Sequence, residues 1–132
     1  MAKIIQTKGK RKRSVARATL KEGKGIVRIN GKLLNVIEPK LFRLKIKEPL
    51  LLAEEIADKV NISVNVFGGG IMSQADASRL AIAKSLVQYS KKLEKTFLDY
   101  DRQLLVADVR RKETRKPNTH GKARSKRQKS YR

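Results

Sequence analysis

The chain of 132 residues has no cysteine, no tryptophan and a single histidine, His120. Without cysteine it can form neither a disulfide nor a thiolate metal site, which fits a reducing cytoplasm. No run approaches the ~18–20 apolar residues of a membrane span, and the apolar stretch near the N-terminus is too short for a signal peptide. We therefore expect a cytoplasmic protein without a membrane partner.

Acidic residues are scarce at both ends of the sequence. The chain has 33 Lys and Arg against 12 Asp and Glu, a net charge of +21. Residues 1–17 hold seven basic residues and no acid, and residues 110–132 hold eleven and one, so the ends carry +17 and residues 18–109 only +4. We predict a globular domain with a basic N-terminal arm over 1–109 and an extended basic tail over 110–132.

The tail contains almost nothing that could join a core. Its only apolar side chains are Ala123 and the ring of Tyr131. Such a segment cannot bury enough surface to offset its ordering entropy, so we expect it to fold only against a polyanion, most commonly RNA. A membrane-surface protein would place its basic residues on one face of an apolar helix, and neither end has that face.

Alternating and turn-forming residues predict the strands. Residues 14–22 alternate, residues 23–25 (GKG) indicate a turn, and residues 26–30 alternate again, which predicts a hairpin over about 14–30. Asn30-Gly31 is a further hairpin signal, with a short strand after it. The clearest strand is 60–67, because Val60, Ile62, Val64 and Val66 alternate strictly with polar residues.

Three helical regions follow from periodicity and end signals. Pro39 opens a helical stretch whose expected face is Leu41, Phe42, Leu44 and Ile46, and Pro49 is expected in the first turn of a separate helix. Ser73, with Asp76 as capping-box partner, predicts a helix running to about Leu93. Another short apolar piece includes Leu98 and Leu104–Val106. The predicted fold class is α/β (α+β), a two-layer domain with helices on one face of a sheet.

Candidates for catalysis or metal binding are weak. His120 has no nearby carboxylate to orient it, so stacking on a base, binding a phosphate or facing solvent are the alternatives. Asp99, Asp101 and Asp108 scatter around a helix axis, and Arg102 and Arg110 would neutralise them. With no other nucleophile–base pair in view, we expect no enzyme activity, no cofactor and no small-molecule substrate.

Two segments are candidates for phosphate binding. The basic run over residues 8–13 can be a solvated loop leading into a strand, or a clamp on a phosphate backbone, since its charges repel one another without an anion. Gly68-Gly69-Gly70, between a strand and a helix, can be a turn that needs positive φ or a phosphate-binding loop. It lacks the Lys and hydroxyl of a nucleotide-binding P-loop.

Three ordered segments resemble the small-subunit ribosomal protein S9 family over nearly the whole chain. They are residues 8–31 (basic run, V-A-R and I-N-G), 67–87 (glycine loop and helix, with Gln74-Ala75 and Arg79) and 104–132. The last contains the family's D-x-R-x-x-E core, here Asp108, Arg110, Glu113, Arg115 and Lys116. Ser73 in the glycine loop, where bacterial members tend to have Gly, and the Ser-Tyr-Arg ending are archaeal or eukaryote-like departures.

The resemblance implies a fold, partners and site residues. The fold is that of the second domain of ribosomal protein S5. The partners are the small-subunit rRNA in the head of the subunit, neighbouring head proteins and the anticodon stem-loop of the peptidyl-site tRNA. The residues implied for rRNA binding are Lys8, Lys10, Arg11, Lys12, Arg13, Arg17, Gly69, Gly70, Arg79, Arg110, Arg111, Lys112, Arg115, Lys116, Lys122, Arg124, Lys126 and Arg127. Those implied for tRNA binding are Lys129, Ser130, Tyr131 and Arg132.

Two other classes of function stay open at this point. Charge alone would equally support a DNA-compacting protein, which would bind duplex DNA as tightly as rRNA. The fold implied by the resemblance is shared with some kinases, so a small phosphotransferase is the other alternative. The missing acid or lysine near the glycine loop argues against it, and a nucleotide-binding assay would test it.

Overall fold

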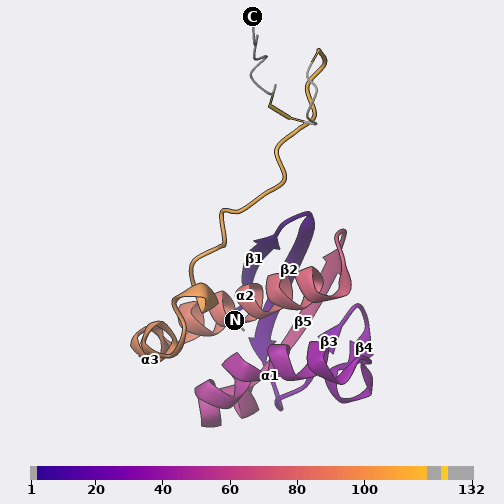
Figure 1. Cartoon of the computed structure of the whole chain (residues 1–132). Coiled ribbons are helices and arrows are strands. Elements are labelled where there is room, and N and C mark those ends of the chain that lie inside the picture. The colour runs from indigo at the N-terminus through magenta and orange to yellow at the C-terminus, as the bar shows by residue number, and fades with distance from the viewer. Residues whose placement is uncertain (1–2, 119–122, 125–132) are drawn as a thin grey trace, which may run out of the picture.

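The computed structural model describes residues 3–118 and 123–124, and helices cover one face of its sheet (Figure 1). The strands are β1 (Ile5–Arg11), β2 (Ser14–Glu22), β3 (Val27–Ile29), β4 (Lys32–Leu33) and β5 (Val60–Phe67), in the spatial order β1-β2-β5-β3-β4. The helices are α1 (Lys40–Ala53), α2 (Ile71–Tyr89) and α3 (Leu93–Tyr100), with short 3-10 turns at Leu34–Val36, Glu54–Lys59 and Arg102–Leu104. The expected mixed α/β fold is confirmed.

β5 is the central strand of the sheet. Val60, Ile62, Val64 and Val66 are all buried and point toward the helices, whereas Ser63, Asn65 and Phe67 are exposed on the other face. β5 pairs antiparallel with β2 and parallel with β3. Both edges of β5 are therefore hydrogen-bonded to neighbouring strands, which places it in the middle of the sheet.

The hairpin predicted over 14–30 is wrong, although both of its strands exist. β2 and β3 do not pair with each other, because β5 lies between them. The chain instead makes hairpins between β1 and β2 and between β3 and β4. The second turns at Asn30-Gly31 as predicted, with φ of 52° and 82°, and Asn30 also exchanges side-chain hydrogen bonds with the backbone of Val66.

The first part of the basic run lies in a strand, which corrects the expected loop: residues 8–11 are in β1 and residues 12–13 connect it to β2. β1 pairs with β2 along its length, from Ile5 opposite Leu20 to Arg11 opposite Ser14. Thr7 donates a hydrogen bond of 2.7 Å to the carbonyl of Ala81 in α2. A Cβ atom at Gly9 would lie 2.2 Å from the carbonyl oxygen of Ala77, so only glycine lets α2 pack this closely on β1.

α1 is longer than predicted and contains Pro49 in its interior. Its buried residues are Phe42, Ile46, Pro49 and Ala53, while Leu41 and Leu44 are exposed, which corrects half of the predicted face. Proline normally breaks a helix because it lacks an N–H and its ring meets the preceding turn. Here the ring is fully buried in the core, and this packing holds the helix on to Ala53.

α2 begins two residues before the predicted start, and the predicted capping box is wrong. Gly70 is the N-cap, no side chain caps the first turn, and Asp76 bonds to other elements instead. Ile82, Ala83 and Leu86 are buried, whereas Leu93, the predicted end of this helix, belongs to α3. None of the described helices is long and apolar enough to cross a membrane.

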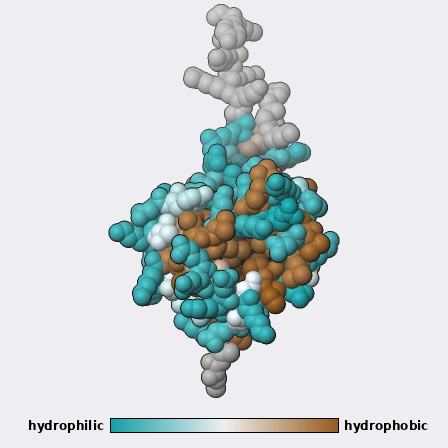
Figure 2. Space-filling model, turned by 90° about the horizontal axis from the view of Figure 1, so that it is seen from below, coloured by the Kyte–Doolittle hydropathy of each residue, from teal (hydrophilic) through white to brown (hydrophobic). Residues whose placement is uncertain are grey.

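The two ends of the domain differ in character. From Val106 to Asn118 the chain forms no helix or strand and extends away from the sheet (Figure 1). Figure 2 views the opposite end, where apolar side chains gather on the surface. Exposed Ile26, Leu33 and Leu51 help to line a hollow of about 550 Å³ between the β3–β4 hairpin and α1.

Candidate nucleic-acid interface

The turn between β1 and β2 presents the basic run. Arg11 and Ser14 are opposite each other, so Lys12 and Arg13 form a two-residue turn, with Lys12 at a positive φ of 53°. Both turn residues are exposed, whereas the Arg11 side chain is only 17 % exposed. The run is therefore divided: Lys12 and Arg13 meet solvent at the tip, and Arg11 points inward.

The glycine loop packs directly on this turn. Gly68 and Gly69 have φ of 78° and 64°, as the turn interpretation predicts, whereas Gly70 has an ordinary φ of −95°. The Ser14 hydroxyl donates to the Gly68 carbonyl at 2.7 Å. A Cβ at Gly69 would lie 2.3 Å from Ser14 Oγ, so the close approach requires glycine.

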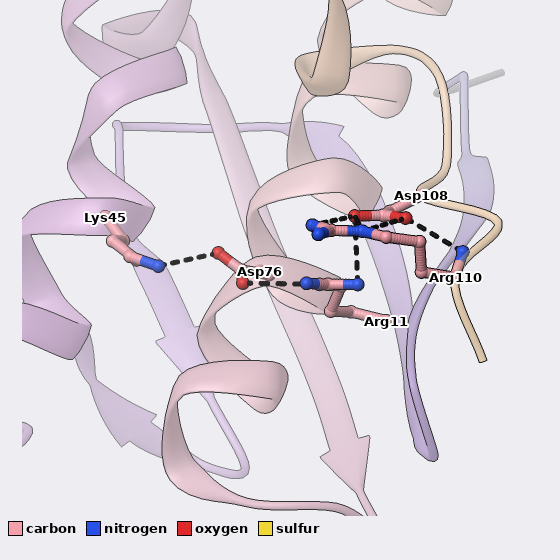
Figure 3. Close-up of polar contacts among 5 residues, drawn as sticks. All are labelled: Arg11, Lys45, Asp76, Asp108 and Arg110. Atoms are coloured by element: carbon pink, nitrogen blue, oxygen red, sulfur yellow. Dashed lines mark hydrogen bonds and ion pairs between the residues drawn. The ribbon is translucent and has the colours of Figure 1, made fainter. Parts of the chain in front are cut away.

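Asp108 joins the basic turn to the beginning of the tail (Figure 3). Its Oδ2 lies 2.9 Å from Arg11 Nη1 and 2.8 Å from Arg110 Nη2. The Arg110 side chain and backbone N–H both donate to this carboxylate, and with the charge of Arg11 they lower the pKa of Asp108 from 3.8 to about 2. Because the Asp108 side chain is only 7 % exposed, this cluster fixes where the tail begins.

Asp76 extends the same cluster to α1. The carboxylate accepts from Lys45 Nζ at 2.9 Å and lies 3.8 Å from Arg11 Nε (Figure 3). Arg11 therefore sits between two carboxylates, one from α2 and one from the segment after the 3-10 turn at Arg102–Leu104. Its charge is paired inside the protein, and the sequence predicts for Asp76 a capping role, not a contact with Arg11.

These elements enclose a basic cleft of about 820 Å³. It is lined by Arg11, Lys12, Arg13, Gly69, Gly70, Ser73, Arg110, Arg111 and Lys112. The six cations come from the two ends of the chain and meet at the N-terminus of α2, whose helix dipole adds positive potential. Among the described residues, Lys12, Arg13, Arg111 and Lys112 have no acidic partner, so their charges are available to an anion.

Three of the predicted rRNA-binding residues lie outside the cleft, on the uncovered face of the sheet. Lys8 and Lys10 occupy outward positions of β1, and Arg17 is exposed on β2 directly opposite Lys8. None of the three lines the cleft. The predicted set is therefore divided between two surfaces.

Arg79 lies inside the protein rather than at either surface. Its side chain is 14 % exposed and forms ion pairs with Glu48 of α1 and with Asp101, the latter at 3.1 Å. The backbone N–H of Gln103 and the Arg79 guanidinium both lower the pKa of Asp101. Arg79, not Arg102, is thus the cation that neutralises Asp101, and it links three helical elements.

The described part of the tail is exposed and internally paired. Glu113 accepts from Lys116 Nζ at 3.0 Å and from Arg124 Nε at 2.9 Å, and Arg115 is exposed. His120 and the predicted residues Lys122, Lys126, Arg127, Lys129, Ser130, Tyr131 and Arg132 lie outside the described residues. Over residues 3–118 and 123–124, no three His, Cys, Asp or Glu side chains group as a metal site.

Comparison with known proteins gives one consistent result. A family model described as "Ribosomal protein S9/S16" matches residues 9–132. Curated relatives from Methanococcus maripaludis strains C7 and C5 are each 49 % identical over 133 residues, covering 98 % of this chain and 99 % of the relative. Each of these archaeal relatives bears the name "Small ribosomal subunit protein uS9".

Proposed function

The chain belongs to the ribosomal protein S9/S16 family, and from this premise we propose that its basic cleft binds the phosphate backbone of the small-subunit rRNA. As a member of this family, the chain is a structural constituent of the small ribosomal subunit. The convergence of cations from both chain ends on one cleft carries the proposal. Phosphates would neutralise charges that otherwise repel one another.

Four residues are the proposed phosphate contacts in the cleft. Lys12 and Arg13 approach from the β1–β2 turn, and Arg111 and Lys112 approach from the beginning of the tail. Arg11 and Arg110 are held by Asp108 and position the other four. Gly70 lets a phosphate come close to the α2 N-terminus, because a Cβ there would point into open space.

The salt dependence of binding tests this assignment. Each phosphate contact changes the slope of log affinity against log salt by about 0.7 for single strands and 0.9 for duplexes. Replacing Lys12 and Arg13 with alanine should therefore reduce the slope for small-subunit rRNA by about 1.4–1.8. A matched pair, Lys91→Ala and Lys92→Ala, removes two exposed charges away from the cleft and should change it less. Equal slopes for the two double variants would refute the cleft.

We further propose that the chain acts in the head of the subunit and that its last residues contact tRNA. The family resemblance supports this role for Lys129, Ser130, Tyr131 and Arg132. The 23 residues from Arg110 onward could span at most about 80 Å when extended. A guanidinium can bind a phosphate through two parallel hydrogen bonds, and a tyrosine ring can stack on a base.

Deleting residues 129–132 tests the tRNA contact. Small subunits should still assemble, and peptidyl-site tRNA should bind about 1–3 kcal/mol more weakly, the scale of hydrogen bonds to charged groups. Filter binding of deacylated tRNA to reconstituted subunits measures this. Unchanged tRNA affinity, or loss of assembly, would contradict the proposed role.

The apolar hollow at the other end is the proposed contact with a neighbouring head protein. It combines exposed Leu33 and Leu51 with polar Lys47, Glu54 and Asp58, a composition typical of a protein interface. Leu51→Asp should weaken association with that neighbour and leave rRNA affinity unchanged. An intact assembly with this variant would speak against the hollow as an interface.

We also propose that the chain has no catalytic activity. The sequence lacks a nucleophile paired with a base, and the glycine loop lacks the lysine of a nucleotide-binding loop. Titration with a fluorescent ATP analogue tests the phosphotransferase alternative, and competition between rRNA and duplex DNA tests the DNA-compacting one. Saturable nucleotide binding, or equal affinity for duplex DNA, would favour the corresponding alternative.

A further inference from the structure

The outward face of the sheet has no described element packed on it. The helices cover the other side, where Ile5, Leu20, Ile62 and Val64 are buried. The pairing register aligns three rows of side chains across the open face. One row is Lys8, Arg17 and Asn65, and the next is Lys10, Val15 and Phe67. A third crosses the middle of the sheet through Thr19, Ser63 and Arg28.

Charge on this face has one sign. Among the outward positions of the described strands the cations are Lys8, Lys10, Arg17, Lys21 and Arg28, and none of these positions carries a carboxylate. The cations are spread over β1, β2 and β3 rather than gathered at one edge. Such a face complements an extended polyanion.

An aromatic ring and an amide lie among these cations. Phe67 is 54 % exposed at the end of β5, directly before the glycine loop and therefore next to the basic cleft. Asn65 is exposed two residues earlier on the same face. In the described part of the chain, the Asn65 side chain makes no hydrogen bond, so its donor and acceptor are available.

A shallow hollow continues the face away from Phe67. It has a volume of about 460 Å³ and is lined by the apolar Ile26 and Ile62 together with Thr19, Lys21, Arg28, Asn61 and Ser63. The hydroxyls and the two cations can bond to a sugar-phosphate chain. Phe67, Asn65 and this hollow lie along one strand, β5, and together form a continuous path.

We propose that the outward face of the sheet binds single-stranded RNA, with an unpaired base stacked on Phe67. Asn65 hydrogen-bonds a base edge, and Lys8, Lys10 and Arg17 contact phosphates. A duplex would present mainly its backbone and would leave the ring and the amide unused, whereas unstacked bases use both. The inference rests on the proposed RNA-binding function and names a second, different site for it.

Binding of two RNA probes by the full chain tests the proposal. The probes are a fluorescent 12-nucleotide oligouridylate and a perfectly paired RNA hairpin, measured by anisotropy at one fixed salt concentration. Phe67→Leu should weaken oligouridylate binding by about five- to tenfold, the low end of base–aromatic stacking. It should leave hairpin affinity within a factor of two.

Two control variants separate the possible failures. Tyr100→Leu makes a similar change at a ring that is 55 % exposed on α3, and it should alter neither probe. Lys12→Ala with Arg13→Ala should weaken both probes. If that cleft variant binds like the unchanged chain, the proposed function fails. If it weakens both probes while Phe67→Leu changes nothing, only the sheet-face site is overturned, and a protein partner becomes the better occupant.

Crosslinking provides a readout that does not depend on a variant folding. Oligouridylate containing 4-thiouridine is irradiated with the unchanged chain, and the crosslinked peptides are identified by mass spectrometry. Crosslinks in the peptide containing Phe67 are expected. Crosslinks confined to the cleft and the tail would overturn the proposal.

Discussion

The charge state of Asp108 is coupled to the folded structure. Its pKa of about 2 lies below the ordinary 3.8, because Arg110 and Arg11 favour the ionised form. The folded chain therefore holds fewer protons than the unfolded chain between these values. The stabilisation from this carboxylate is fully present above about pH 5 and is lost as the pH falls toward 2.

Thermal unfolding at different pH values measures this effect. Asp108→Asn should lower the Tm at pH 7, since Arg11 then stays buried without its close carboxylate. When the pH is lowered from 5 to 2, the Tm of the variant should fall by less than the Tm of the unchanged chain. Asp99→Asn, at an exposed position, should follow the unchanged chain at every pH. Parallel curves for Asp108→Asn and the unchanged chain would show that the pair is not coupled to folding.

At the scale of elements, the contact between the glycine loop and the β1–β2 turn is the most sensitive to a single change. Gly69→Ala should destabilise the fold by about 1.5–3.5 kcal/mol. Roughly 1–2 kcal/mol comes from positive φ and about 0.5–1.5 from displacing the Ser14 hydroxyl from its hydrogen bond. Chemical denaturation measures the loss.

Gly31 offers a matched control for this prediction. It also has a positive φ, 82°, but a Cβ there would meet nothing within 4 Å. Gly31→Ala should therefore show only the backbone contribution, about 1–2 kcal/mol. If both variants lose the same stability, the contact with Ser14 contributes nothing.

Local patterns predicted some elements closely and failed on others for physical reasons. β5 was predicted at its observed bounds because its apolar side chains alternate without a break. β1 was missed because its inward residues include Thr7 and Gly9, so the burial pattern carries little hydrophobic signal. The predicted partner of β2 was wrong because the strand that pairs with its second edge, β5, lies about 40 residues later in the sequence. No turn signal between neighbouring segments can indicate such a distant partner.

At the scale of the whole molecule, we predict that the domain folds without most of its tail. Leu104 is the last buried apolar residue among those described. Chains ending after Val109 or after Lys112 should both unfold cooperatively in calorimetry. The shorter one should have the lower Tm, because it lacks Arg110 and leaves Asp108 with one fewer partner. A broad transition without cooperativity in both would mean that the tail belongs to the core.

The candidate site could be predicted in its parts but not in its arrangement. Charge density made the basic run and the tail candidates for phosphate binding, and the family resemblance implied Arg110, Arg111 and Lys112 in particular. That they share one cleft depends on Asp108 reaching Arg11, a contact between residues almost a hundred positions apart. Charge also could not distinguish Arg79 from the exposed cations, because its ion pairs with Glu48 and Asp101 inside the protein are visible only in the structure.

The position of β5 affects how the chain folds as it is synthesised. β5 is the last of the five strands to be made, yet it lies between the two hairpins. Until it emerges, the β1–β2 and β3–β4 hairpins share no strand, and α2, which covers β1 and β2, has not yet been made. The nascent chain thus displays its cationic first hairpin well before it has a core. We expect the five-stranded sheet to form in one late step, when β5 pairs with β2 of the first hairpin and with β3 of the second.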